Sequence, residues 1–133
     1  MAWLGTDLRQ RFGQTLLAKV ITEEIKQSQA KMICLPNVRL ESDIVYLKKM
    51  PEFILINIET EPKIRYQRLT KRSQNKDDKT KTWQQFLKDA KLPTEMAIRK
   101  VAKKAKFKID NNGDFKELYR QIDEILKKSK INK

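Results

Sequence analysis

The hydrophobic positions near the C-terminal end of the chain recur with the period of a helix. Between residues 115 and 126 they fall three and four positions apart, on one stripe of a 3.6-residue helix. Asp114 stands where a side chain accepts N–H groups of the first turn, and Glu117 completes a capping-box-like start. Gly113 supplies the backbone freedom of the turn before it. The pattern therefore predicts a strand ending at Asp110, a tight turn and a final amphipathic helix.

The N-terminal half shows a helical pattern followed by two apolar runs. Residues 2–29 predict a helix in two pieces, with Gly13 as the joint. Residues 32–35 predict a short buried strand, and this places the thiol of Cys34 in the interior. Residues 53–58 form the most apolar run of the chain. They predict a strand buried on both faces, as in parallel sheets that are covered by helices.

The middle of the chain alternates turn signals with further helical patterns. Residues 43–49 predict a short helix, and Pro62 stands near the start of a second one. Residues 73–82 are polar throughout and predict a loop. Helical patterns then restart at Trp83 and at Pro93, the latter beginning a basic helix. Strands alternating with helices predict an α/β protein with a parallel sheet.

The length and the charge of the chain limit its organisation and its partners. The 133 residues suffice for one domain, 1–133, with a single modest core. Lys and Arg number 30 against 17 Asp and Glu, and the net charge of +13 attracts phosphates, nucleotides, nucleic acid or an anionic membrane. Lysine-rich surfaces also occur where heat resistance is selected, so the charge alone does not identify the partner.

Missing residue types and patterns exclude several classes of function. The chain has no histidine, which excludes Ser-His and Cys-His triads and histidine-containing metal sites. Its single cysteine excludes an internal disulfide. No run approaches the roughly 18 apolar residues of a membrane span, and Met1 is not followed by a charged and then apolar leader. We therefore expect a cytoplasmic protein with no membrane partner.

Motifs near both ends of the chain carry a family resemblance. Residues 105–113, AKFKIDNNG, followed by Glu117-Leu118 and Gln121-Ile122, resemble the C-terminal signature of dephospho-coenzyme A kinases and related P-loop, nucleoside monophosphate kinase-like proteins. Residues 4–18, LGTDLRQRFGQTLLA, are similar to a stretch on the acceptor-binding side of the same proteins. The resemblance implies a three-layer P-loop NTPase fold with a parallel sheet. The alternative is a strand–turn–helix unit of any other α/β domain.

Two arginines belong to the acceptor side by this resemblance. Arg9 is assigned to the acceptor's phosphate as a bidentate anion clamp, and an exposed helix arginine is the alternative interpretation. Residues 37–43, NVRLESD, resemble the element after the family's third strand, where Arg39 keeps a substrate-binding arginine. The family has an aspartate there that supports Mg²⁺. Pro36 and Asn37 stand in its place and carry no charge, so no metal ligand is predicted.

Three further arginines resemble those of the family's lid. Residues 62–72, PKIRYQRLTKR, are similar to the approach to the lid of nucleoside monophosphate kinases, in a lid segment of about residues 65–90. Arg65, Arg68 and Arg72 follow one another at helical spacing on one face. Lid arginines stabilise charge on the transferring phosphoryl group, so the resemblance makes these three the catalytic candidates. A solvated helix face is the alternative.

The phosphate-binding loop of that family does not occur in the sequence. The loop reads G-x-x-x-x-G-K-(S/T), whereas the glycines here are residues 5, 13 and 113 and no Gly-Lys pair is present. ATP and Mg²⁺, the cofactors of intact relatives, are therefore not assured for this chain. The family's first strand would lie between the strands expected at 31–35 and 53–58. Its loss predicts an apolar slot, or direct pairing of these strands, and leaves an oligomer open.

Two functions follow from the sequence. The first is that of an ATP-dependent phosphotransferase acting on dephospho-coenzyme A or a nucleoside monophosphate, incomplete or inactive as this chain, which binds a nucleotide or another small phosphorylated molecule. The alternative is a non-catalytic basic module that binds nucleic acid or an acidic partner. Aromatic residues are few, and no stacking platform for bases is visible. Nucleic-acid affinity that falls steeply with salt, without nucleotide binding, would favour the alternative.

Overall fold

The structure is a computed structural model that describes residues 2–72 and 78–129. Within these ranges the chain is an α/β protein with six α-helices and one small sheet of two parallel strands. Two short 3₁₀-helices, η1 and η2, precede the first strand. The elements in chain order are α1 (Ala2–Phe12), α2 (Leu16–Gln27), η1 (Glu41–Ile44), η2 (Leu47–Lys49), β1 (Ile56–Glu59), α3 (Pro62–Arg72), α4 (Trp83–Asp89), α5 (Pro93–Ala102), β2 (Phe107–Asp110) and α6 (Phe115–Lys128).

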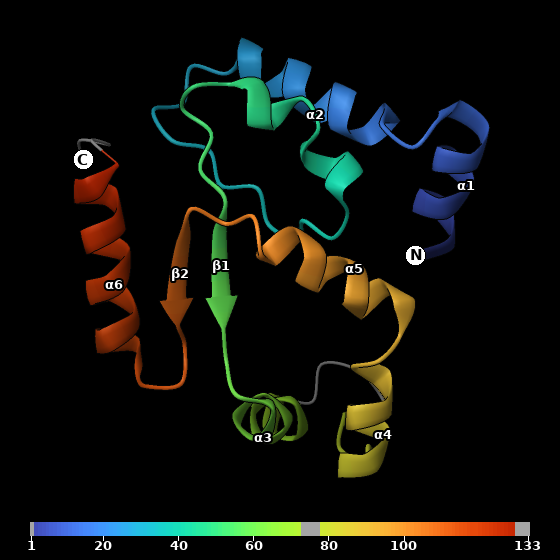
Figure 1. The fold of residues 1–133 in the computed structure, drawn as a ribbon, viewed down its shortest axis with the longest axis vertical. Coiled ribbons are helices and arrows are strands. Elements are labelled where there is room, and N and C mark those ends of the chain that lie inside the picture. Colours follow the sequence, from blue (N-terminus) through green and yellow to red (C-terminus); the bar gives the residue numbers. More distant parts are fainter. Residues whose placement is uncertain (1, 73–77, 130–133) are drawn as a thin grey trace.

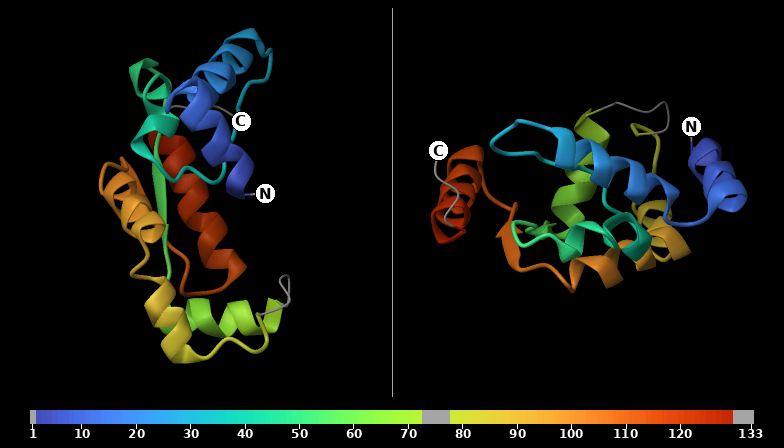
Figure 2. Two further views of the ribbon diagram at one scale, coloured as in Figure 1. Left: turned by 90° about the vertical axis from the view of Figure 1, so that its right-hand side faces the viewer. Right: turned by 90° about the horizontal axis from the view of Figure 1, so that it is seen from above.

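The two strands lie side by side and run in the same direction (Figure 1). Ile56 pairs with Phe107 at one end of the register and Glu59 with Asp110 at the other. Helices α5 and α6 lie on opposite faces of the strand pair, as Figure 2 shows from the side. Parallel strands are typically covered in this way, because the connection between them returns over the sheet. The fully buried apolar side chains belong to α2, the 3₁₀ segments, α5, β2 and α6: Ala18, Ile44, Leu47, Val101, Ile109 and Ile125.

The C-terminal unit confirms the local prediction, with two corrections. β2 ends at Asp110, and α6 begins after Asp114, whose Oδ1 accepts the N–H of Glu117 at 2.9 Å. The carboxylate of Glu117 does not complete a capping box, because it pairs with the guanidinium of Arg120. Gly113 does not have a positive φ, so the turn does not use its extra backbone freedom. The helical stripe is confirmed, but its first ring, Phe115, is 73% exposed.

Gly13 is the joint that the sequence predicts between α1 and α2. Its φ of +95° lies in the region that residues with a Cβ rarely adopt. The Gly13 N–H donates to the carbonyl oxygen of Arg9 at 3.0 Å, and its own carbonyl oxygen accepts from Leu16 at 3.2 Å. These bonds close the end of α1 and open α2, so one residue lets the chain change direction between two helices.

The prediction of a buried strand at residues 32–35 is wrong. The segment has no regular secondary structure, and Met32, Ile33 and Cys34 are exposed. Asn37 turns the chain with a φ of +63°, directly after Pro36. A short apolar run becomes a strand only where a partner strand takes up its N–H and C=O groups, and β1 pairs with β2 instead.

The second apolar run forms a shorter and more exposed strand than its sequence predicts. β1 begins at Ile56, and the side chains of Ile56 and Ile58 are 40% and 58% exposed. The expectation of a strand buried on both faces is therefore wrong for the described residues. The reason is geometric: the buried contacts of α6 are made with β2, and they leave the apolar face of β1 open.

The remaining elements lie near their predicted positions, but one predicted α-helix is of another type. The helix expected at 43–49 is replaced by η1 and η2. The loop expected at 73–82 lies partly outside the described residues, because 73–77 are not described. α4 and α5 begin at Trp83 and Pro93 as predicted. No helix among the described residues is both long enough and apolar enough to span a membrane.

Candidate phosphate-binding site

Helix α3 carries the three lid arginines and starts at the carboxyl end of the sheet. β1 ends at Glu59 and α3 begins at Pro62, so the helix leaves directly from the strand (Figure 1). The N–H of Glu61 donates to Oδ1 of Asn112 at 2.7 Å, which ties this junction to the turn after β2. In open α/β sheets, ligands bind outside the carboxyl ends of the strands. The start of α3 is therefore placed where such a fold binds its ligand.

Arg68 uses its guanidinium to hold the turn after β2. Nη1 donates to the carbonyl oxygen of Asn111 at 2.6 Å, and Nη2 donates to that of Gly113 at 3.1 Å. The planar fork of an arginine suits two acceptors at this spacing. Of the three lid candidates, Arg68 is thus placed as the link between α3 and the turn that leads into α6.

Arg65 and Arg72 point toward the segment that follows α3. The guanidinium carbon of Arg65 lies 5.5 Å from the centre of the Phe86 ring on α4, which is cation–π geometry. Nη2 of Arg72 lies 3.8 Å from Oδ2 of Asp78, whose residue is 1% exposed. The three lid arginines therefore do not converge on one partner: Arg68 contacts the turn after β2, whereas the other two contact α4 and the residue 78 region.

Helix α4 is anchored on α3 by aromatic rings. Tyr66 of α3 meets Trp83 of α4 with ring centres 5.4 Å apart, and Phe86 with ring centres 5.6 Å apart. Trp83 and Phe86 stack on each other at 5.5 Å. The hydroxyl of Tyr66 donates to the carbonyl oxygen of Lys81 at 2.8 Å. Sequence reasoning missed the part played by Tyr66, although its position between two arginines on α3 placed it beside the lid.

The acceptor-side arginines meet at a carboxylate that the sequence did not single out. Nη2 of Arg9 on α1 lies 3.0 Å from Oδ1 of Asp43, with both side chains mostly buried. Oδ2 of Asp43 accepts the N–H groups of Arg39 at 3.0 Å and of Leu40 at 2.8 Å. Asp43 therefore joins α1 to η1 and fixes the backbone at Arg39. The signal for it was a carboxylate at the third position of a short helix, where it accepts N–H groups from the residues before the helix.

The two groups of arginines lie on different parts of the fold. α1 lies beside α2, whereas α3 crosses the carboxyl end of the strand pair (Figure 1). Arg9 and Arg39 come together through Asp43. This pair is therefore separate from the three arginines on α3.

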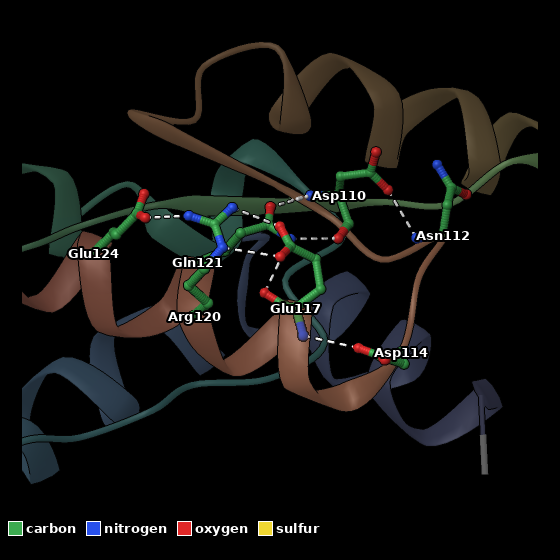
Figure 3. Close-up of polar contacts among 7 residues, drawn as sticks. All are labelled: Asp110, Asn112, Asp114, Glu117, Arg120, Gln121 and Glu124. Atoms are coloured by element: carbon green, nitrogen blue, oxygen red, sulfur yellow. Dashed lines mark hydrogen bonds and ion pairs between the residues drawn. The ribbon is translucent and has the colours of Figure 1, made fainter.

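The C-terminal signature residues form a hydrogen-bonded frame around the turn (Figure 3). The side chain of Gln121 accepts from the N–H of Asp110 and donates to its carbonyl oxygen, both at 2.8 Å. Oδ1 of Asp110 accepts the N–H of Asn112 at 2.7 Å. Arg120 bridges Glu117 and Glu124 on the surface of α6, and its hydrogen bond holds the pKa of the Glu117 carboxyl below its ordinary value. These motif residues build the turn that Arg68 then holds.

Comparison with known proteins gives relatives over most of the chain. A protein of Staphylothermus marinus is 28% identical over 91% of this chain and 62% of its own length. A protein of Sulfurisphaera tokodaii is 30% identical over 91% of this chain and 66% of its own length. A third, from Methanothermobacter thermautotrophicus, is 25% identical. These relatives are archaeal UPF0200 proteins. No protein-family model matches the chain.

The UPF0200 name states no activity, so the kinase-like relationship stays a prediction. The chain spans a little under two thirds of the length of the first two UPF0200 relatives, 62% and 63%. Among the described residues, no group of three or more Asp, Glu or Cys side chains is placed to hold a metal ion. What they offer to a phosphorylated ligand is a set of positioned guanidinium groups.

Proposed function

We propose that this chain binds a phosphorylated small molecule at the carboxyl end of its parallel strands, as part of a P-loop NTPase fold of the nucleoside monophosphate kinase type. The observation that carries the proposal is the junction of β1 and α3. It projects an arginine-bearing helix from the carboxyl end of a parallel strand and ties that helix to the neighbouring turn through Arg68. This is the edge at which α/β folds bind phosphate ligands. The ligand class is a nucleotide or dephospho-coenzyme A.

Arg65 and Arg72 are the groups that contact phosphate in this proposal. The side chain of Arg65 is exposed and makes no hydrogen bond or ion pair with a described residue, so its N–H groups are available to a ligand. Arg72 approaches Asp78 only to 3.8 Å, beyond hydrogen-bond distance. Two guanidinium groups on one helix, seven residues apart, suit the several oxygens of a phosphate chain. Arg68 acts as a positioning residue, because its N–H groups already bind the turn.

Arg39 is the acceptor-side contact, and Arg9 supports it. The side chain of Arg39 is exposed and makes no ion pair with a described residue, while its backbone is fixed by Asp43. Arg9 neutralises that same carboxylate from α1. In this arrangement, Arg39 offers a guanidinium to the acceptor and Arg9 holds the loop in place.

Phosphoryl transfer requires more than these residues supply. The chain contains no Gly-Lys pair for a phosphate-binding loop. We propose that another polypeptide segment supplies this loop, and that the chain alone binds phosphate without transferring it. It then contributes lid arginines and an acceptor arginine to an ATP-dependent phosphotransferase.

Calorimetric titration with ATP, without Mg²⁺, tests the proposal. We expect saturable binding that the double substitution Arg65→Ala/Arg72→Ala weakens by at least about tenfold, since each charged hydrogen-bond donor contributes on the order of 1.5 kcal/mol or more. Arg99→Ala is the matched control, because Arg99 is an exposed arginine on α5 that makes no ion pair with a described residue. This control should leave ATP binding unchanged.

The alternative function, a basic module for nucleic acid, is favoured by the net charge of +13. The same titration separates the two. Binding of a single-stranded RNA of about 20 nucleotides that falls steeply with salt, with no ATP binding, supports the alternative. Arg99→Ala would also weaken it, by a similar factor for each charge removed as the lid substitutions, since non-specific binding depends on the total charge.

A further inference from the structure

A second concave surface lies between α2 and the 3₁₀ segment before β1. It encloses about 380 Å³ and is lined by one face of α2 and by η2 with its flanking residues. Its position differs from that of the lid arginines, because α2 lies toward the amino end of β1 and α3 at the carboxyl end (Figure 1). The α2 side chains that line it include Lys19, Glu23 and Lys26. These residues are four and three positions apart and so share one helix face.

The cavity is positively charged. Three lysines and one glutamate line it, and Lys26 pairs with Glu23 at 2.8 Å. Lys19 and Lys49 are exposed and form no ion pair with the described residues, and the lining of three lysines and one glutamate carries a net charge of +2. A bound dianion would neutralise this charge. The cavity therefore favours a doubly negative group.

The wall between the lysines is partly apolar. Tyr46 and Met50, which flank η2, supply a ring and a thioether. The hydroxyl of Tyr46 donates to Oγ1 of Thr15 at 3.4 Å, which sets the direction of the ring from the start of α2. Thr22 contributes no donor, because its Oγ1 donates to the carbonyl oxygen of Ala18 at 2.7 Å. A ligand that fills the cavity thus meets cations at the two lysines and apolar surface between them.

We propose that this cavity binds a phosphomonoester whose body is small and partly apolar. The phosphate lies between the ammonium groups of Lys19 and Lys49, and the body packs on Tyr46 and Met50. A volume of about 380 Å³ is at the lower end of the range for small-molecule sites, which suits a ligand with a small body. The site is separate from the lid arginines and does not depend on them.

The chain offers a local probe of this site. It contains 4 methionines, at positions 1, 32, 50 and 96, so methyl-¹³C methionine labelling gives a simple NMR spectrum. We expect phenyl phosphate to shift the methyl signal of Met50 saturably while those of Met32 and Met96 stay in place. Inorganic phosphate should compete with phenyl phosphate at higher concentration, because it keeps the charge and lacks the apolar body.

Substitution of the two unpaired lysines gives the decisive comparison. Lys19→Ala/Lys49→Ala should raise the dissociation constant for phenyl phosphate by at least about tenfold. The matched control is Lys116→Ala/Lys127→Ala, which removes the same charge from exposed positions on α6 and should leave the constant unchanged. Lys19→Arg/Lys49→Arg should retain most of the affinity, which separates charge from folding.

Three results would overturn the proposal. The first is a Met50 methyl signal that phenyl phosphate does not shift. The second is an affinity that Lys19→Ala/Lys49→Ala and the control pair on α6 lower equally. The third is a shift of the Met32 and Met96 signals together with that of Met50. The variant Arg65→Ala/Arg72→Ala should keep the Met50 response in full. Loss of ATP binding in that variant together with a normal Met50 response would support both sites independently, whereas loss of the Met50 response would contradict this one.

Discussion

Nη1 of Arg68 donates a hydrogen bond of 2.6 Å to the carbonyl oxygen of Asn111, 43 residues further along the chain. The bond joins the helix that follows β1 to the turn that follows β2, and so holds the carboxyl ends of both strands together. The expected effect of Arg68→Ala is a free energy of unfolding lower by about 1–2 kcal/mol, since two hydrogen bonds from a charged donor are lost at an exposed position. Urea denaturation followed by circular dichroism measures it.

The control for this prediction is Arg99→Ala, which removes an exposed arginine without these contacts and should change stability by less than about 0.5 kcal/mol. Arg68→Lys should recover only part of the loss, because an ammonium group lacks the planar fork that reaches two carbonyl oxygens. Equal stability of Arg68→Ala and Arg99→Ala would contradict the structural role of Arg68.

The two glycines with described surroundings give a matched pair of predictions. Gly13 has a φ of +95° and Gly113 does not have a positive φ. An added Cβ meets nothing within 4 Å at Gly13 and only ordinary contacts at Gly113. Gly13→Ala should therefore lower the free energy of unfolding by about 1–2 kcal/mol through backbone strain alone. Gly113→Ala should be neutral or slightly stabilising. Thermal unfolding compares the two variants, and a Gly113→Ala variant less stable than Gly13→Ala would contradict the positive φ at the joint between α1 and α2.

The hydroxyl of Tyr66 is expected to stabilise the docking of α4. Tyr66→Phe removes its hydrogen bond to the carbonyl oxygen of Lys81 and keeps the ring contacts with Trp83 and Phe86. The expected cost is about 1 kcal/mol. Tyr119→Phe is the control, because Tyr119 is 60% exposed and its hydroxyl bonds to no described residue. Chemical denaturation followed by circular dichroism compares the two; a similar loss in both variants would argue against this contact.

The carboxyl of Glu41 should titrate below its ordinary range. Nζ of Lys104 lies 2.8 Å from Oε2 of Glu41 and lowers the pKa of that carboxyl through a hydrogen bond and charge attraction. Because the pKa is lower in the folded state, the pair stabilises the fold above the ordinary glutamate pKa of about 4.3, and the contribution is lost as pH falls through the folded pKa. Carboxyl ¹³C NMR measures this titration.

In the same titration, Lys104→Ala should raise the pKa of Glu41 toward its ordinary value, whereas Lys127→Ala should leave it unchanged. The difference should shrink at high salt, since both partners are exposed and salt screens exposed pairs. An unshifted Glu41 pKa in the unmodified chain would mean that this pair does not hold η1 to the turn after α5.

Elements governed by local pattern were predictable from the sequence. The joint at Gly13, the cap at Asp114, the start of α5 and the stripe of α6 all depend on residues within a few positions of one another. Each has a specific local cause: a positive φ, a side chain that accepts N–H groups, a proline in the first turn, or helical spacing. No distant contact is required to recognise them.

The strands and the site were less predictable, because their state depends on distant partners. Residues 32–35 are as apolar as a strand, yet they have no strand to pair with and stay irregular. Asp43 contacts the side chain of Arg9, 34 residues away, and Tyr66 contacts the carbonyl oxygen of Lys81, 15 residues away. No local pattern reveals such contacts. The arginine spacing on α3 predicted one common face, but the guanidinium groups of Arg68 and Arg65 go to different partners.

Titration of ATP into protein labelled with ¹⁵N at arginine tests the central claim most directly. The side-chain Nε–H signals report each guanidinium separately. The proposed phosphate site predicts saturable shifts for Arg65 and Arg72, with Arg68 and Arg99 unchanged. No shift at Arg65 and Arg72, or a shift of Arg99 with the same apparent affinity, would contradict a phosphate site on α3.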